Sequence, residues 1–352
     1  MKPQTPVLYD ESDASFDVVE EVSEGDLWFL PGPMDQEPDY LVPGPRAEPA
    51  EASITASWTR AEAGLAARLA KVAGRLGALD ERLRRGPEGW RHRLALIEAV
   101  DLSWVVGDRV SPDQLALWMS MRLSGAYDVT VALARAGWAV RRLTGGPEPE
   151  ADLAAFLDRR DPGTTADATE RLEDRAYGWL GVMATAQHLH PITRACMGFH
   201  LWHLAGLGQR GDRMEAAVTA GRVAASGGRG AIFAPLAMGG AGGLGATGTP
   251  VQRLDRWLGG MENAALTAMR HLDDIEGWSA RAETTMAPLS GRTPPALRRV
   301  LSEWPVVSAP MVAALTGVSR AAAQRNLTWM EDRGLIRELT GQGRYRMWRT
   351  AT

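Results

Sequence analysis

Polar side chains recur on one side of a segment near the C-terminal end of this 352-residue sequence. Across residues 320–333, Ala323, Leu327 and Met330 are spaced four and three residues apart, which predicts a helix with one buried face. Guanidinium and carboxamide groups on the opposite face would match the hydrogen-bonding edges of guanine and adenine. The pattern therefore predicts direct contacts with DNA bases. The outward-facing residues are Arg320, Ala321, Ala322, Gln324, Arg325 and Thr328.

Capping residues predict two short helices that would position this face. Ser308 can cap a first helix that ends at Gly317, because serine bonds free N–H groups and glycine adopts the left-handed conformation. Ser319 can cap the second helix, residues 320–333, and Gly334 closes it. The two helices are therefore expected to be joined by a tight turn.

A β-hairpin is predicted after these helices, with strands around 335–339 and 345–349 and a glycine-rich turn between them. Helix, turn, helix and hairpin is the order of a winged helix-turn-helix, whose second helix enters the major groove of DNA. The hairpin, or wing, is expected to contact phosphates or the minor groove. Such contacts are predicted for Gln342, Arg344 and Arg346, and Ser319 is expected on the DNA backbone.

The charge of this C-terminal segment supports the same interpretation. Residues 293–352 hold nine arginines and four acidic residues, a net charge of +5, whereas the whole chain has a net charge of −4. A basic module on an acidic chain is typical of nucleic-acid binding. The alternative is a winged helix used for protein contacts, but the outward arginines and glutamine favour DNA.

We therefore predict a sequence-specific protein that binds double-stranded DNA, a transcriptional regulator. A single module makes few contacts for specific affinity, so a homodimer on a palindromic site is expected. An effector or a protein partner is a further expectation for the rest of the chain. A second hypothesis is a structural partner on a plasmid that binds DNA without sequence preference.

The first 57 residues differ sharply from the rest of the sequence. They contain thirteen acidic residues against Lys2 and Arg46, a net charge of −11, and are rich in proline. This composition predicts an acidic, largely irregular arm. The arm could shield the basic module as a DNA mimic. The favoured interpretation is a solvated tail, because blocks of charge are commonly just solvating.

Residues 58–287 read as an all-helical domain. Residues 58–85 predict one amphipathic helix whose leucines alternate at spacings of four and three. The seam is expected to pack into the body of the protein, with a dimer interface as the alternative. A long helix is predicted over 251–287, with a break at Gly277. The fold class is thus mainly α, a multi-helix body between an acidic arm and a winged helix at 293–352.

Bulk features limit the class of protein. A single cysteine, Cys196, excludes a disulfide framework. The sequence starts without an apolar signal segment and contains no run of eighteen apolar residues, so neither secretion nor a membrane span is predicted. A cytoplasmic protein is expected.

Two patterns resemble chemical sites without their usual context. Residues 243–248 form a GxGxxG, but no strand is predicted before it, so a loop or close helix packing is expected in place of a dinucleotide site. Four histidines lie between residues 188 and 203, where they could hold a metal. No acidic residue lies in that stretch to orient them, and the core interpretation is favoured. The four are His188, His190, His200 and His203.

The tripeptide His190-Pro191-Ile192 resembles the start of the Fic motif, in which a histidine base is followed by a metal-binding acid and a glycine-rich anion site. Here Arg194 replaces the acid and 195–197 replace the glycine-rich run, and Val106 stands where some Fic proteins carry an inhibitory glutamate. The resemblance implies that both catalyst and brake are lost. We predict no catalytic residues, metal or cofactor, with a degenerate Fic-type nucleotidyl transferase as the alternative.

A closer similarity in layout is to a family of plasmid-encoded proteins from rhizobia and related bacteria. It is carried by residues 79–93, 105–117 and 189–191 and by the winged helix. The resemblance implies an all-helical domain of unknown function joined to a C-terminal helix-turn-helix DNA-binding domain.

Overall fold

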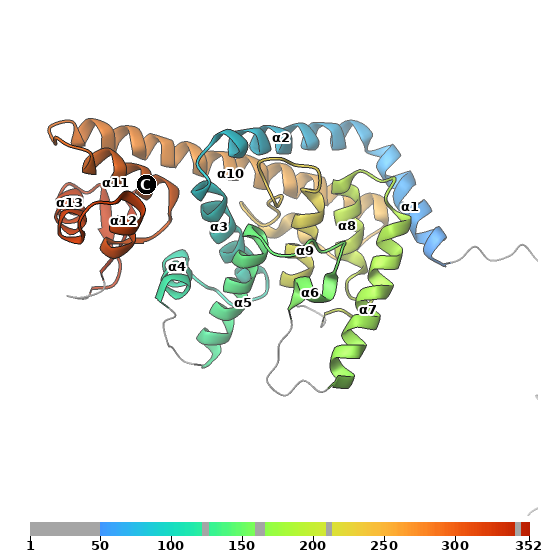
Figure 1. The fold of residues 1–352 in the computed structure, drawn as a ribbon. Helices are drawn as coiled ribbons and strands as arrows, with labels where there is room; N and C mark the ends of the chain where they lie inside the picture. Colours follow the sequence, from blue (N-terminus) through green and yellow to red (C-terminus); the bar gives the residue numbers. More distant parts are fainter. Residues whose placement is uncertain (1–49, 122–126, 159–165, 209–212, 342–345) are drawn as a thin grey trace, which may run out of the picture. The chain divides into compact units, whose positions relative to one another are not determined.

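The structure is a computed structural model that describes residues 50–121, 127–158, 166–208, 213–341 and 346–352. In these ranges the chain is mainly α, as predicted (Figure 1). The helices are α1 (Ala50–Gly64), α2 (Ala66–Arg85), α3 (Gly89–Val105), α4 (Pro112–Met121), α5 (Tyr127–Thr144), α6 (Leu153–Leu157), α7 (Ala166–Thr185), α8 (Pro191–Leu201), α9 (Met214–Ala224), α10 (Pro250–Met286), α11 (Thr293–Glu303), α12 (Ala309–Thr316) and α13 (Arg320–Asp332), with a 3-10 helix, η2 (Ala241–Leu244).

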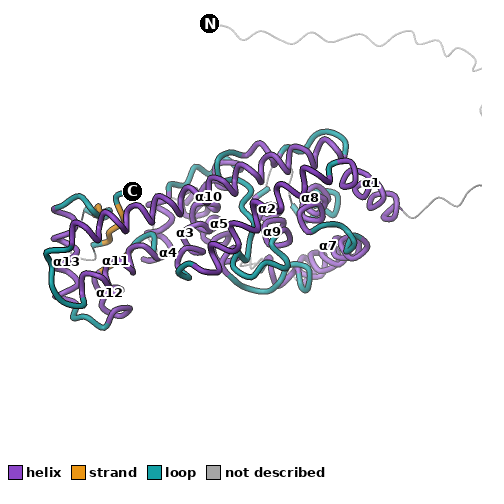
Figure 2. The backbone as a smooth tube through the Cα atoms, turned by 90° about the horizontal axis from the view of Figure 1, so that it is seen from above, coloured by secondary structure: helices purple, strands orange, loops and turns teal. Residues whose placement is uncertain are grey.

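The longest of the described helices, α10, organises the helical body. Its N-terminal part buries Leu254, Trp257 and Leu258 in the core. Thr249 begins the helix with a capping box, in which its hydroxyl accepts from Gln252 N and the Gln252 side chain accepts from Thr249 N. Figure 2 shows α2 and α10 side by side. The two helices are joined by ion pairs, one of them between Lys71 and Glu262 at 2.8 Å.

Two expectations for these helices were wrong. The single helix predicted over 58–85 is two helices, α1 and α2, which meet at Leu65 directly after Gly64. The break expected at Gly277 does not occur, because Ile275 and Trp278 on either side are buried and hold the helix in place. The leucine seam of α2 faces the core of the body, with Leu69, Val72, Leu79 and Leu83 buried.

The arm prediction falls almost wholly on residues 1–49, which lie outside the described part of the chain. Helix α1 begins at Ala50, so the helical part of the chain starts earlier than the predicted residue 58.

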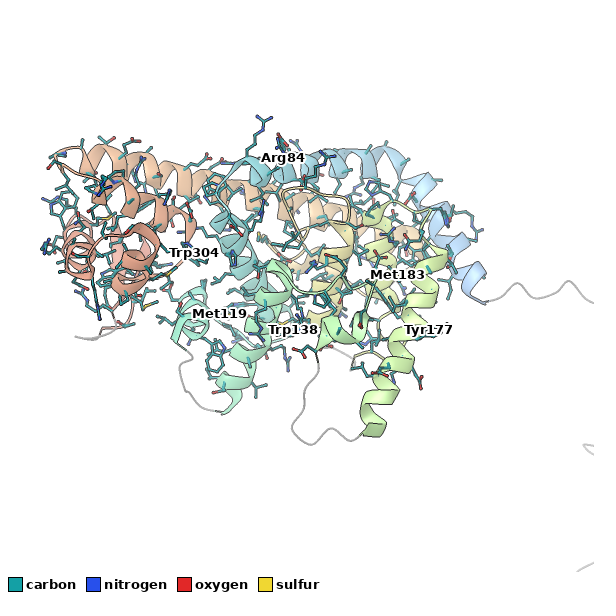
Figure 3. All side chains as sticks on the ribbon, in the orientation of Figure 1. Arg84, Met119, Trp138, Tyr177, Met183 and Trp304 are labelled. Atoms are coloured by element: carbon teal, nitrogen blue, oxygen red, sulfur yellow. The ribbon has the colours of Figure 1, made fainter. Side chains whose placement is uncertain are left out.

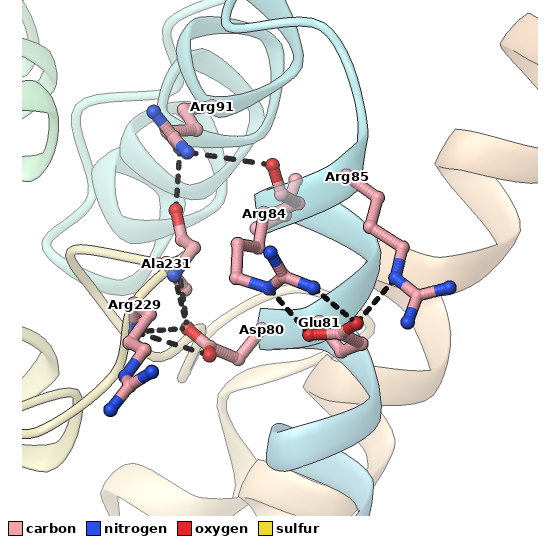
Figure 4. A network of polar contacts seen from close by, with 9 residues as sticks. Asp80, Glu81, Arg84, Arg85, Arg91, Arg229 and Ala231 are labelled. Atoms are coloured by element: carbon pink, nitrogen blue, oxygen red, sulfur yellow. Dashed lines mark hydrogen bonds and ion pairs between the residues drawn. The ribbon is translucent and has the colours of Figure 1, made fainter.

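Two carboxylates, one half-buried and one fully buried, hold the long loop between α9 and α10 (residues 225–249) by hydrogen bonds to its backbone. Asp80 of α2 accepts hydrogen bonds from the backbone N–H groups of Arg229, Gly230 and Ala231 (Figure 4). Burial opposes ionisation of Asp80, but these bonds outweigh it and lower the pKa of the carboxyl. Glu98 of α3, fully buried, accepts from Leu236, Ala237 and Met238.

The C-terminal part has the predicted order of helix, turn, helix and hairpin. The described strands are β1 (Val307–Ser308), β2 (Ile336–Glu338) and β3 (Met347–Thr350), in the sheet order β1-β3-β2. Both pairings are antiparallel, and Trp348 stands opposite Val307 on one side and Glu338 on the other. Strand β1 was not predicted, because two residues are too short to show a sequence pattern.

The helical body and the winged helix share an extensive contact. A side chain at Gly89 of α3 would place its Cβ atom 2.5 Å from the carbonyl oxygen of Glu303 in α11, so only glycine fits. The rings of His92 and Trp304 are 5.1 Å apart, and Trp304 is labelled in Figure 3. Arg93 donates to three backbone carbonyls at the end of α11, those of Leu301, Ser302 and Trp304.

Candidate nucleic-acid interface

Helix α13 has the local structure expected of a recognition helix. Gly317 adopts a φ of 70° and ends α12, which permits the tight turn into α13. Ser319 caps α13, because its hydroxyl accepts from Ala322 N at 3.2 Å. The predicted inner face is fully buried, with Ala323, Leu327 and Met330 each 0% exposed.

The outer face of α13 presents two arginines. Arg320 and Arg325 are exposed, and their guanidinium groups make no ion pair with any residue that the structure describes. Ala322, Gln324 and Thr328 are half-buried beside them. Free guanidinium groups on an exposed helix can form paired hydrogen bonds with a base edge or a phosphate without breaking an internal contact.

Arg333, directly after α13, is a third exposed arginine that was not predicted from the sequence. The guanidinium carbon of Arg333 lies 3.6 Å from the centre of the Trp329 ring, and Arg333 is exposed. The stacking fixes the direction of the cation through a cation–π contact. The spacing of four residues between an aromatic residue and an arginine is the signal that could have revealed the pair.

The wing is only partly described. Gln342 and Arg344, both predicted to contact DNA, lie outside the described residues. The guanidinium of Arg346 is bound within the protein, where Nη2 lies 2.7 Å from a carboxylate oxygen of Glu331. It also lies 4.9 Å from the Trp348 ring centre. Arg346 thus ties the root of the wing to α13, and its predicted contact with DNA stays a prediction.

The carboxylate of Glu338 accepts backbone hydrogen bonds at the start of the wing's turn. Glu338 accepts from the backbone N–H groups of Thr340 and Gly341, each at 2.8 Å. Burial alone would raise the pKa of Glu338, but a hydrogen bond from the Thr340 hydroxyl together with these two backbone bonds outweighs it and lowers the pKa. The ionised carboxylate therefore holds the first residues of the turn in place.

Several arginines behind the basic charge of the segment are used internally. Arg337 and Arg349 both pair with Asp113 of α4, at 3.1 Å and 3.4 Å. Arg298 pairs with Glu283 at 2.8 Å. Among the described arginines of the segment, the positive charge available to a ligand therefore lies mainly on and directly after α13, and the sequence count of nine arginines overstates it.

The histidines of this stretch bond or stack with other residues of the helical body, although His188 and His203 are exposed. His200 is mostly buried and stacks on Trp58 at 6.1 Å, and burial lowers its pKa to about 3. His188 bonds the Thr59 hydroxyl and His203 bonds the Gly208 carbonyl. No group of three His, Cys, Asp or Glu side chains stands close enough for a metal within the described residues.

The residues that resemble the Fic motif have structural partners. His190 caps α8, because its Nδ1 accepts from Ile192 N at 3.2 Å. Arg194 pairs with Glu150 at 2.8 Å. The GxGxxG at 243–248 lies in η2 and the loop before α10, with no strand preceding it in the described chain.

Comparison with known proteins agrees with the geometry at the C-terminal end. Residues 295–350 match the family model described as an HTH DNA binding domain. A solved structure of a Fic family protein from Desulfovibrio desulfuricans G20 is similar over 82% of this chain and 95% of its own, with 14% identity and a TM-score of 0.44. No curated protein matches the chain. The C-terminal segment is a helix-turn-helix DNA-binding domain, as predicted. None of the described helices combines the length and apolar character needed to cross a bilayer.

Proposed function

We propose that the protein is a sequence-specific transcriptional regulator in the cytoplasm, and that it inserts α13 into the major groove of its operator. The observation that carries this proposal is a pair of exposed arginines, Arg320 and Arg325, which make no ion pair with a described residue and lie on a helix whose inner face is buried. In this arrangement Arg320, Gln324 and Arg325 contact bases, and Ser319 and Thr328 lie near the backbone.

The proposal includes a homodimer, because one winged helix offers few contacts for specific binding and two-fold operators match two-fold proteins. It assigns no reaction to the helical body. The guanidinium of Arg194, at the place of the acid in the Fic motif, is already paired with Glu150. The body positions the winged helix instead.

The test is selection of bound duplexes from a random DNA pool by the full chain. We expect an enriched, two-fold symmetric motif. Arg325→Ala should then weaken binding to the best site by about 1–3 kcal/mol and relax the base preference at one position of the motif. The matched control is Arg75→Ala, which removes an exposed arginine from α2. Binding with a steep salt slope and no enriched motif would indicate the nonspecific alternative.

A further inference from the structure

A cavity of about 210 Å³ lies where the helical body meets the winged helix. Its body side is formed by residues of α3, α4 and α10, and its other side by residues 305–306 and the end of β3. A ligand in this cavity would therefore contact both parts at once. The DNA-binding proposal makes no use of this space.

Arg93 and Arg349 in the cavity wall each have guanidinium N–H groups that make no hydrogen bond with a described residue. Arg93 uses Nε and Nη2 to bind backbone carbonyls, which leaves the donors of Nη1, and it forms no ion pair with a described carboxylate. Arg349 pairs through Nη1 with Asp113, while its buried Nε has no acceptor in the described structure. A buried donor without an acceptor is unfavourable, so an acceptor that reaches one of these groups gains a hydrogen bond.

The two acidic side chains of the wall are less available than these donors. Asp113 already pairs with two arginines, Arg337 and Arg349. Asp274 is exposed at the rim. The rest of the wall is largely apolar and includes Leu94, Leu272 and Ile275, all buried. Unmet guanidinium donors beside an apolar wall favour a small organic anion with a hydrocarbon part.

We propose that this cavity binds a small organic carboxylate, with its oxygens on Arg349 and Arg93 and its hydrocarbon part against Leu94, Leu272 and Ile275. Because the ligand bridges the body and β3, it stabilises one placement of the winged helix and so changes operator affinity. This regulatory consequence rests on the proposed DNA-binding function, but binding of the carboxylate does not.

The test uses the full chain without DNA and two probes, benzoate and hexanoate, with benzamide as the uncharged counterpart of benzoate. Titration calorimetry and saturation-transfer NMR should show saturable binding of at least one carboxylate below about 10 mM, with benzamide at least about tenfold weaker. If neither carboxylate saturates in that range, or if benzamide binds as well as benzoate, the proposal is overturned.

Three variants locate the site. Ala116→Leu fills the cavity and Arg349→Lys keeps the positive charge but removes Nε, so each should weaken binding about tenfold or more. The second change is mild and keeps the test valid if the first one fails to fold. Ala73→Leu narrows a separate cavity between α2 and the loop after α9, and should leave affinity unchanged. Unchanged binding in Arg349→Lys would refute the assignment.

Operator affinity with and without saturating benzoate or hexanoate then tests the regulatory part. We expect a shift of at least about threefold that disappears in Arg349→Lys. Saturable carboxylate binding with no shift would overturn the regulatory part alone. Loss of all operator binding in both conditions would count against the proposed function and leave the carboxylate site standing.

Discussion

The indole N–H of Trp278 in α10 donates to the carbonyl oxygen of Leu335 at 2.7 Å, and both residues are buried. Leu335 follows α13 after Arg333 and Gly334, and its own N–H donates to the carbonyl of Met330 within that helix. The longest described helix of the body is thus fastened to the segment between α13 and β2. The body therefore helps to set the position of α13.

Trp278→Phe should destabilise the protein by about 0.5–1.5 kcal/mol, because the buried Leu335 carbonyl loses the indole donor and keeps only the Ala351 N–H. Urea denaturation measures the change. Trp257→Phe is the matched control, since the Trp257 N–H is buried in α10 without a partner in the described structure. Equal losses in the two variants would show that the hydrogen bond to Leu335 contributes nothing specific.

The serine caps of α12 and α13 allow an effect on stability to be separated from an effect on DNA binding. Ser308 and Ser319 each accept a backbone N–H at the start of α12 and α13. Each serine-to-alanine change should cost about 0.5–2 kcal/mol of stability. Only Ser319→Ala should also weaken operator binding in the folded protein, because Ser319 is exposed beside Arg320. Equal operator affinities would remove Ser319 from the proposed interface.

Gly89→Ala should destabilise the protein by about 1–3 kcal/mol, because the added methyl group would overlap the backbone of Glu303. Thermal denaturation provides the measurement. Gly77→Ala in α2 is the control, since a Cβ there meets nothing within 4 Å and alanine favours the helix. We expect Gly77→Ala to be neutral or stabilising, and a similar effect of both changes would argue against the close contact between α3 and α11.

The contributions of Glu98 and Asp101 to stability should fall as pH rises from about 4 to about 7, because burial raises the pKa of Glu98 to about 7 and that of Asp101 to about 6. A carboxyl with a raised pKa binds its proton more tightly in the folded state. Its contribution is therefore complete below the unfolded pKa and is lost as pH rises through the folded pKa.

For Glu98 the loss should be roughly 2–3 kcal/mol, and Glu98→Gln should remove this falling contribution from the pH dependence. The free energy of unfolding in urea at several pH values is the measurement. A slope that is unchanged in Glu98→Gln would assign the pH dependence to other groups.

The winged helix was predictable because its signals are local. Ser308, Gly317, Ser319 and Gly334 mark helix ends through bonds and backbone angles that involve only near neighbours in the chain. The inner face of α13 follows from its spacing alone. These features specify most of the candidate interface without knowledge of the body.

Other features depend on contacts between distant segments and could not be predicted. Asp113 neutralises Arg337 and Arg349 from more than two hundred positions away in the chain. Arg346 pairs with Glu331 only because β3 returns beside α13. The helix through Gly277 is similarly held by burial of its neighbours, which outweighs the weak helix preference of glycine.

Helix α10 has a consequence for attempts to isolate the DNA-binding segment. This helix is roughly 55 Å long. It buries Leu254 in the core of the body, and it buries Trp278 and Met286 near the winged helix, so it contributes to the hydrophobic core of both parts. A fragment that starts at residue 293 would lack the Trp278 ring and would expose to water the apolar side chains that this ring covers. The intact chain should unfold in a single calorimetric transition. A fusion of the DNA-binding segment to another protein should fold only if α10 is included.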